Sequence, residues 1–282
     1  MTNYPMQKNN ALKEVFLFFG LTLGLSYLVF WGPLAFFKIP AASFVGRATG
    51  PVWALALYVI GGFVPSLVAV FLTWKHQGAV GLRQLGRRMI QFNIGWRWYL
   101  AAAAVVIISV AAQLVMIRLF GQTFPMPLFL AQLGSVVPLL ILGPLSEEIG
   151  WRGYALERLQ TKWNALVSSL IVGLVWGLWH LPLFFMMGTS QRELAIPFGG
   201  FLAGLMALSI LFTWLHNNTH GSIWTAIFFH WIYTYPAQVL ASGVTRSALY
   251  NWLESLPYCL LTLLVVIIWK PLNLIREMRD FS

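Results

Sequence analysis

Long apolar stretches alternate with short polar connections along most of the chain. Each stretch approaches the roughly 20 residues that a helix needs to cross a bilayer. The pattern therefore predicts an all-α fold, a polytopic transmembrane helix bundle with about eight spans. The expected spans are 15–37, 51–74, 98–119, 128–146, 164–187, 196–215, 221–241 and 252–269. The fourth is short and the eighth contains Pro257 near its start, so seven spans plus one re-entrant segment is the alternative.

Composition supports a lipid environment. Apolar residues make up 59% of the 282 residues and charged residues 9%, whereas soluble domains carry about 25% charged residues. A soluble globule of this length could not bury so much apolar surface in one core. The first apolar stretch, 15–37, is longer than the roughly 7–15 residues of a signal-peptide core, so we interpret it as a retained span.

The distribution of Lys and Arg predicts the orientation. With the N-terminus in the cytoplasm, the inner connections hold 13 of these residues and the outer connections 5. The inner set is Lys8, Lys13, Lys75, Arg83, Arg87, Arg88, Arg97, Arg152, Arg158, Lys162, Lys270, Arg276 and Arg279. The outer set is Lys38, Arg47, Arg118, Arg192 and Arg246. The excess predicts that both termini are cytoplasmic.

The net charge of +10 indicates a lipid partner. The basic residues lie between apolar spans and no nucleic-acid recognition module is visible, so we expect anionic lipid and no nucleic acid. The connection at about 75–97 has the pattern of a basic amphipathic helix on the cytoplasmic leaflet, with an ordinary positive-inside loop as the alternative. Cys259 is the single cysteine, which excludes an intrachain disulfide.

No repeat or linker divides the chain, so it reads as one structural domain. Within it we expect N-terminal spans (1–125), a core (126–245) and a C-terminal span with a basic tail (246–282).

Two adjacent carboxylates, Glu147 and Glu148, follow the apolar run 136–145. Ionisable groups at membrane depth are costly and suggest function. Arg152 lies four residues after Glu148, on the same helical face, so the two are expected to pair. Glu147 is left without a basic partner at helical spacing. The alternative is that the acidic pair simply marks the water interface.

Two histidines, His180 and His230, lie inside separate apolar runs. A lone buried histidine is more often a hydrogen-bonded structural residue than a ligand. Together with Glu147, however, they predict one cluster that either binds a metal or activates water. His216 and His220 flank a polar segment and are interpreted as part of a structural turn.

Three short motifs resemble those of the CPBP intramembrane proteases, the CAAX-protease and bacteriocin-processing family. Ser-Glu-Glu-Ile-Gly-Trp-Arg-Gly at 146–153 resembles Glu-Glu-x-x-x-Arg, and Trp176-Gly-Leu-Trp-His180 resembles Phe-x-x-x-His. His230-Trp-Ile-Tyr-Thr234 resembles His-x-x-x-Asn, with Thr234 in place of Asn. The resemblance covers about 130–240.

The resemblance implies peptide hydrolysis in the membrane, with a membrane protein or leader-type peptide as substrate. Glu147 and His180 would activate water, and His230 would stabilise the oxyanion with Thr234 as a weaker donor. Glu148, Arg152 and Trp176 would support the site, which is expected near the cytoplasmic side.

A metal-free mechanism is favoured. Zinc held by Glu147, His180 and His230 is the alternative mechanism. A non-catalytic immunity or scaffold protein is the alternative function, and the absence of inverted repeats disfavours a transporter. A bacterial inner membrane is the expected location.

Overall fold

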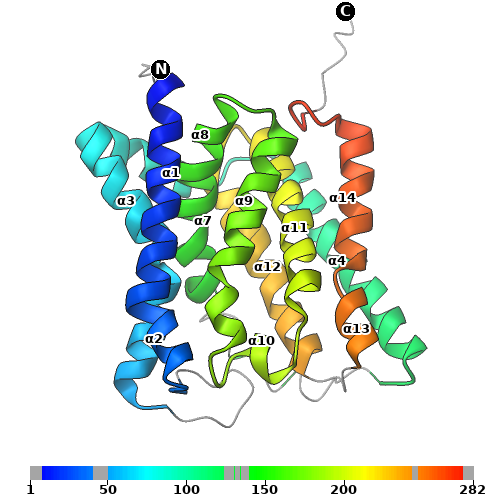
Figure 1. Ribbon diagram of the computed structural model, residues 1–282. Helices are drawn as coiled ribbons and strands as arrows, with labels where there is room; N and C mark the ends of the chain where they lie inside the picture. Colours follow the sequence, from blue (N-terminus) through cyan, green and yellow to red (C-terminus); the bar gives the residue numbers. More distant parts are fainter. Residues whose placement is uncertain are drawn as a thin grey trace, which may run out of the picture.

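The computed structural model describes residues 8–40, 50–123, 130, 134, 140–242 and 247–275, which form a bundle of packed helices (Figure 1). All regular elements among these residues are helical, which confirms the predicted fold class. They are α1 (Lys8–Leu25), η1 (Ser26–Phe30), α2 (Trp31–Phe36), α3 (Val52–Met89), α4 (Trp96–Leu119), η3 (Ile141–Leu145), α7 (Ser146–Gly150), η4 (Trp151–Leu156), α8 (Glu157–Gln160), α9 (Ala165–Trp179), η5 (Leu181–Phe184), α10 (Ser190–Glu193), α11 (Phe198–Asn218), α12 (Ile223–Ser242), α13 (Ala248–Leu253) and α14 (Leu256–Trp269).

Several described helices are suited to crossing a membrane. Large apolar side chains such as Leu28, Ile107 and Ile267 are exposed on the outside of the bundle, where lipid can cover them. The helical segments in the described part that are long and apolar enough to span are Asn10–Phe36, Val52–Met89, Trp96–Leu119, Phe198–Asn218 and Ala248–Trp269. The chain is therefore a multi-pass membrane protein.

The other three expected spans, 128–146, 164–187 and 221–241, are not among these five segments. The region 164–187 contains the shorter helix α9, and 221–241 corresponds to α12. Most of 128–146 lies outside the described residues. The count of eight spans stays a prediction.

The helix that carries the acidic pair differs from the expected one. The sequence predicts a span ending at Glu147 and Glu148, but η3, α7, η4 and α8 follow one another from Ile141 to Gln160. Both carboxylates therefore lie inside the bundle, with 7% and 0% of their surface exposed. Charged residues in the middle of this stretch lower its hydropathy, so the apolar pattern stops before the helical stretch does.

Close packing of small residues positions this helix and its neighbours. A Cβ atom on Gly150 would lie 2.6 Å from the carbonyl oxygen of Pro65, so α7 and α3 approach closely because residue 150 has no side chain. A Cβ atom on Gly173 would lie 2.8 Å from the Cα of Met206, which gives the same contact between α9 and α11. Small residues allow such close approach of membrane helices.

The two ends of the bundle differ. The start of α1, the end of α14 and helix α8 lie at one end, which we call the basic end, whereas α10 and α13 lie at the other (Figure 1). At the basic end α3 continues past Gly78, which has φ of 61°, to Met89. Leu85 is buried there while Arg83 and Arg87 are exposed, as an amphipathic helix requires. Its contact with the lipid leaflet stays a prediction.

Candidate active site

A cavity of about 290 Å³ brings the motif residues together. Its lining includes Glu147, Trp176, His180, His230 and Thr234, which come from α7, α9 and α12 and from the residue that follows α9. Helices α2, α3, α4, α10, α11, α13 and α14 also contribute to the wall, together with the short elements η3 and η5. Residues separated by more than 80 positions in the sequence thus share one cavity.

Glu147 is buried and held by a tryptophan. The indole Nε1–H of Trp176 donates a hydrogen bond of 2.5 Å to its Oε2 atom. No ion pair to Glu147 is present among the described residues. The hydrogen bond favours the ionised carboxylate, because a donor stabilises negative charge. It orients the carboxylate and leaves Oε1 available to a water molecule in the cavity.

Glu148 is the centre of a buried charge network. The Nη1 atom of Arg152 donates to both of its oxygens at 2.9 Å, and Nδ1 of His230 lies 2.7 Å from its Oε1. The predicted Glu148–Arg152 pair is therefore confirmed. Arg152 also stacks on aromatic rings, with its Cζ 4.5 Å from the Trp176 ring centre and 3.9 Å from that of Phe212. Carboxylate and rings together compensate for the loss of water around the guanidinium.

The contact to Glu148 determines what His230 offers to the cavity. A carboxylate accepts hydrogen bonds, so Nδ1 of His230 carries the proton. Nε2 is the other ring nitrogen, and it lies near the η3 turn, where a Cβ atom on Gly143 would be 3.7 Å away. Gly143 adopts φ of 154°, a conformation that glycine tolerates best. In its protonated form His230 presents an N–H donor at Nε2.

His180 is fixed in a different way. It caps the C-terminal end of α9, and its Nδ1 lies 2.8 Å from the carbonyl oxygen of Trp176. Because a carbonyl only accepts, Nδ1 is the protonated nitrogen, and the neutral ring keeps a lone pair on Nε2. His180 can therefore accept a hydrogen bond from water. Trp176 therefore contacts both candidates for water activation. Its indole bonds to Glu147 and its backbone carbonyl bonds to His180.

Thr234 lines the cavity but uses its hydroxyl elsewhere. Its Oγ1 donates a 2.7 Å hydrogen bond to the carbonyl oxygen of His230, one helical turn earlier. A hydroxyl has one proton to donate. The expected role of Thr234 as an oxyanion donor would require this bond to break, so the described geometry does not support that role.

The donor set does not match a metal site. Among the residues that the structure describes, no group of three or more His, Cys, Asp and Glu side chains is placed so as to hold a metal ion. We therefore derive no step through a metal. The zinc alternative with Glu147, His180 and His230 stays a hypothesis for experiment.

The cavity also contains polar residues that the motif analysis did not single out. Gln113 from α4 donates through Nε2 to Oη of Tyr258 at 3.2 Å. Tyr58, Tyr233 and Glu254 line the same space. The available signal was that Gln113 and Glu254 are polar positions within apolar spans. His216 and His220 are not among the lining residues, in keeping with their interpretation as structural.

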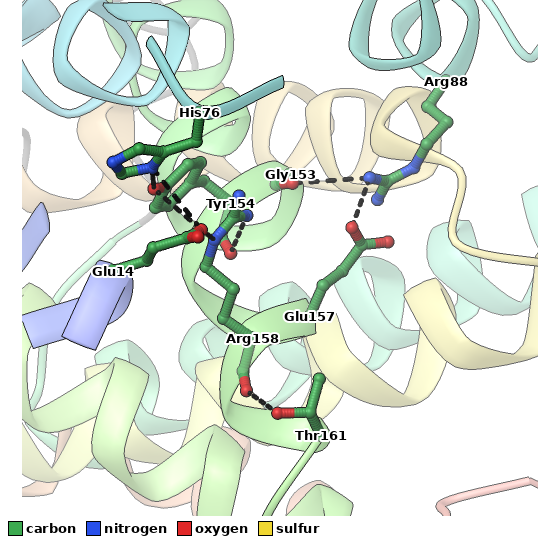
Figure 2. A network of polar contacts seen from close by, with 8 residues as sticks. All are labelled: Glu14, His76, Arg88, Gly153, Tyr154, Glu157, Arg158 and Thr161. Atoms are coloured by element: carbon green, nitrogen blue, oxygen red, sulfur yellow. Dashed lines mark hydrogen bonds and ion pairs between the residues drawn. The ribbon is translucent and has the colours of Figure 1, made fainter. Parts of the chain in front are cut away.

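A second polar cluster lies further along the same helical stretch, toward the basic end (Figure 2). Arg158 donates through Nε to Glu14 at 2.8 Å, and Arg88 donates through Nη1 to Glu157 at 2.6 Å. Tyr154 lies 3.5 Å from Glu14. The cluster ties α1, α3 and α8 together, and each carboxylate has an arginine partner.

Comparison with known proteins places this site in a family. Residues 129–235 match the family described as type II CAAX prenyl endopeptidase Rce1-like. A relative from Methanococcus maripaludis, named CAAX prenyl protease 2, is 36% identical over 110 residues, which cover 38% of this chain and 41% of the relative. The matched region contains all three motifs and the helices that carry them. Residues 129–235 therefore match the Rce1-like CAAX prenyl endopeptidase family, in keeping with the CPBP motifs found in the sequence, and the chain spans less than half the length of this curated relative.

Proposed function

We propose that this protein is an intramembrane endopeptidase in which Glu147 activates a water molecule for attack on a peptide bond. The observation that carries the proposal is the arrangement of Glu147, His180 and His230 on one cavity. The name of the relative supports peptide hydrolysis as the reaction class. The family match supports it as well, because it covers all three motifs.

Water activation requires a base with a free oxygen. Trp176 occupies Oε2 of Glu147 and leaves Oε1 for the water. Nε2 of His180 accepts the second hydrogen of the same water, so the oxygen lone pair is directed toward the substrate carbonyl. Proton transfer to a positioned carboxylate contributes about 10²–10⁴-fold to such reactions.

Oxyanion stabilisation is the role we assign to His230. With Glu147 and Glu148 ionised and Arg152 positively charged, the cluster has one excess negative charge that a protonated His230 neutralises. Its Nε2–H then donates to the oxyanion of the tetrahedral intermediate. A donor placed in a buried site in this way is worth about 10²–10³-fold.

The atoms balance without a cofactor. The water oxygen bonds to the carbonyl carbon, and Glu147 takes one proton. The C–N bond then breaks, and Glu147 returns that proton to the leaving amine. Arg152 and Glu148 hold His230 and are positioning residues in this scheme.

The test is hydrolysis of a peptide library by the purified full chain, with Glu147→Ala as the control. Hydrolysis that the control lacks supports the proposal. Absence of hydrolysis with every peptide, by protein shown to be folded, would favour a non-catalytic scaffold or immunity protein of the same fold.

Metal content is measured on the same preparation. Without a catalytic metal, protein purified in the absence of added zinc should contain well below one equivalent, and chelation should leave turnover intact. The metal-free scheme is wrong if the protein contains stoichiometric zinc, and if turnover is lost when zinc is removed and recovered when zinc is added back. In that case substitution of Glu147, His180 or His230 should also lower zinc content, because loss of a ligand lowers occupancy.

A further inference from the structure

In the proposed reaction the oxyanion receives one hydrogen bond, from Nε2–H of His230. Thr234, the other candidate on α12, donates to the carbonyl oxygen of His230 instead. Oxyanion holes commonly aim more than one donor at the oxygen where charge develops. A second donor would need an unused N–H or O–H group close to His230 in the same cavity.

Tyr233 lies where such a donor is needed. It follows His230 by three residues on α12, and both side chains line the cavity. Residues three apart lie on one face of a helix. The centres of the two rings are 6.4 Å apart. Two donors to one oxygen, each about 2.7–3.1 Å from it, are at most ~6 Å from each other, so rings at this separation can serve the same atom.

The Tyr233 hydroxyl is available to donate. In the part of the chain that the structure describes, no hydrogen bond or ion pair involves this hydroxyl. It is not one of the buried polar atoms that lack a partner, so its oxygen is accessible from the cavity. A phenol in a protein interior usually finds a hydrogen-bond partner through its O–H group. Tyr233 therefore offers an unused donor to a molecule in the cavity.

Neighbouring helices fix the Tyr233 ring. Tyr258 of α14 packs against it edge to face, with ring centres 5.4 Å apart and an interplanar angle of 88°. Gln113 of α4 donates through Nε2 to the Tyr258 hydroxyl at 3.2 Å and so holds this second ring. His230 is likewise held from outside its helix, by Glu148. Donors that are fixed before the reaction stabilise developing charge without reorganisation.

The proposed base lies near the same phenol. The carboxylates of Glu254 and Glu147 both line the cavity, and both are close enough to act electrostatically on Tyr233. A carbonyl whose carbon receives water from Glu147 would therefore have this phenol among the groups around it.

We propose that Tyr233 is a catalytic residue and the second oxyanion donor of this site. In the tetrahedral intermediate, Nε2–H of His230 and the O–H of Tyr233 both donate to the oxyanion. No proton leaves the phenol, so the proton balance of the hydrolysis is unchanged. The proposal rests on the proposed endopeptidase function and adds a residue that the motifs do not assign.

Tyr233→Phe tests this role, because it removes the O–H and keeps the ring that packs against Tyr258. In purified full-length protein, kcat should fall by about 10²-fold, as expected for the loss of one oxyanion donor, with KM and the unfolding temperature little changed. Tyr235→Phe is the matched control, since it makes the same change on the same helix at a residue that is not among the described lining residues. Its kcat should stay near that of the wild type. If folded Tyr233→Phe keeps kcat within about threefold of wild type, the assignment is overturned.

A second comparison separates donation from packing. The motif that α12 resembles has Asn where Thr234 stands, and an Asn amide offers N–H donors. Thr234→Asn should raise kcat of the Tyr233→Phe variant by about tenfold and that of the wild type much less, because the wild type already has its second donor. Equal effects in the two backgrounds would show that positions 233 and 234 do not act on one oxyanion, and would refute the proposal.

Failure of the endopeptidase function would be visible separately. If folded wild-type protein hydrolyses no peptide, the proposed function fails and the role of Tyr233 fails with it. If the wild type hydrolyses peptide and Tyr233→Phe does so equally well, the function stands and only the role of Tyr233 fails.

Discussion

Two polar clusters occupy the same helical stretch, and they differ in one carboxylate, because Glu147 in the cavity has no arginine partner among the described residues. Toward the basic end, Glu14 and Glu157 each face an arginine at hydrogen-bond distance. In the cavity, Glu147 receives a hydrogen bond from a neutral indole instead. A carboxylate paired with arginine is stabilised as an ion and is a poor base. A carboxylate held by a neutral donor is oriented and still available to take a proton. The first cluster is therefore suited to holding helices together and the second to chemistry.

The largest effect should come from Glu147→Gln, because an amide cannot accept the proton. We expect kcat to fall by about 10²–10⁴-fold with folding retained. Glu157→Gln is the matched control, since it makes the same change on the same helical stretch in the other cluster, and kcat should stay near wild type. Equal losses in the two variants would show that the clusters do not differ as described.

Arg152→Ala should act on folding. It leaves Glu148 buried without its arginine partner, and breaking a buried pair from one side costs about 3–5 kcal/mol. The yield of folded, detergent-stable protein should fall sharply, as size-exclusion chromatography and thermal unfolding would show. Normal yield together with complete loss of turnover would instead place Arg152 in the chemistry.

Trp176→Phe removes the indole donor and keeps an aromatic ring beside Arg152. A hydrogen bond to a charged group is worth about 1.5–3 kcal/mol, so kcat should fall by about 10–100-fold while KM changes little. Retention of thermal stability is the control for folding. If kcat is unaffected, the Trp176–Glu147 hydrogen bond does not orient the base.

Arg88→Ala breaks the ion pair with Glu157 in the cluster at the basic end. The pair is partly exposed, with 20% and 32% of the two side chains accessible, so its loss should cost about 1 kcal/mol. We expect a small decrease in the unfolding temperature and a kcat close to wild type. A large loss of turnover without unfolding would connect this cluster to catalysis.

The smallest effect is expected from Thr234→Val. The Thr234 hydroxyl donates to its own helix, so its removal should change kcat by less than about threefold, well below the loss of a true oxyanion donor. Steady-state kinetics on the best library peptide gives the answer. A fall of about 10²-fold would restore Thr234 as an oxyanion donor.

Much of this protein was determined by its sequence. The length and spacing of apolar stretches predicted a helical membrane bundle, because lipid requires every backbone polar group to be bonded within the span. Helical periodicity predicted the Glu148–Arg152 pair, because residues four apart lie on one face. Glu147, His180 and His230 were found because ionisable groups within apolar runs are conspicuous, whereas Trp176 and Thr234 were found only through the resemblance to the family motifs.

Other features depended on tertiary structure, because they join residues far apart in the chain. No local spacing connects His230 with Glu148 or Trp176 with Glu147, and helix packing brings each pair together. The continuation of the helical stretch to Gln160 was not predicted, because hydropathy counts Glu148 and Arg152 as charged, whereas the folded bundle lets them compensate each other.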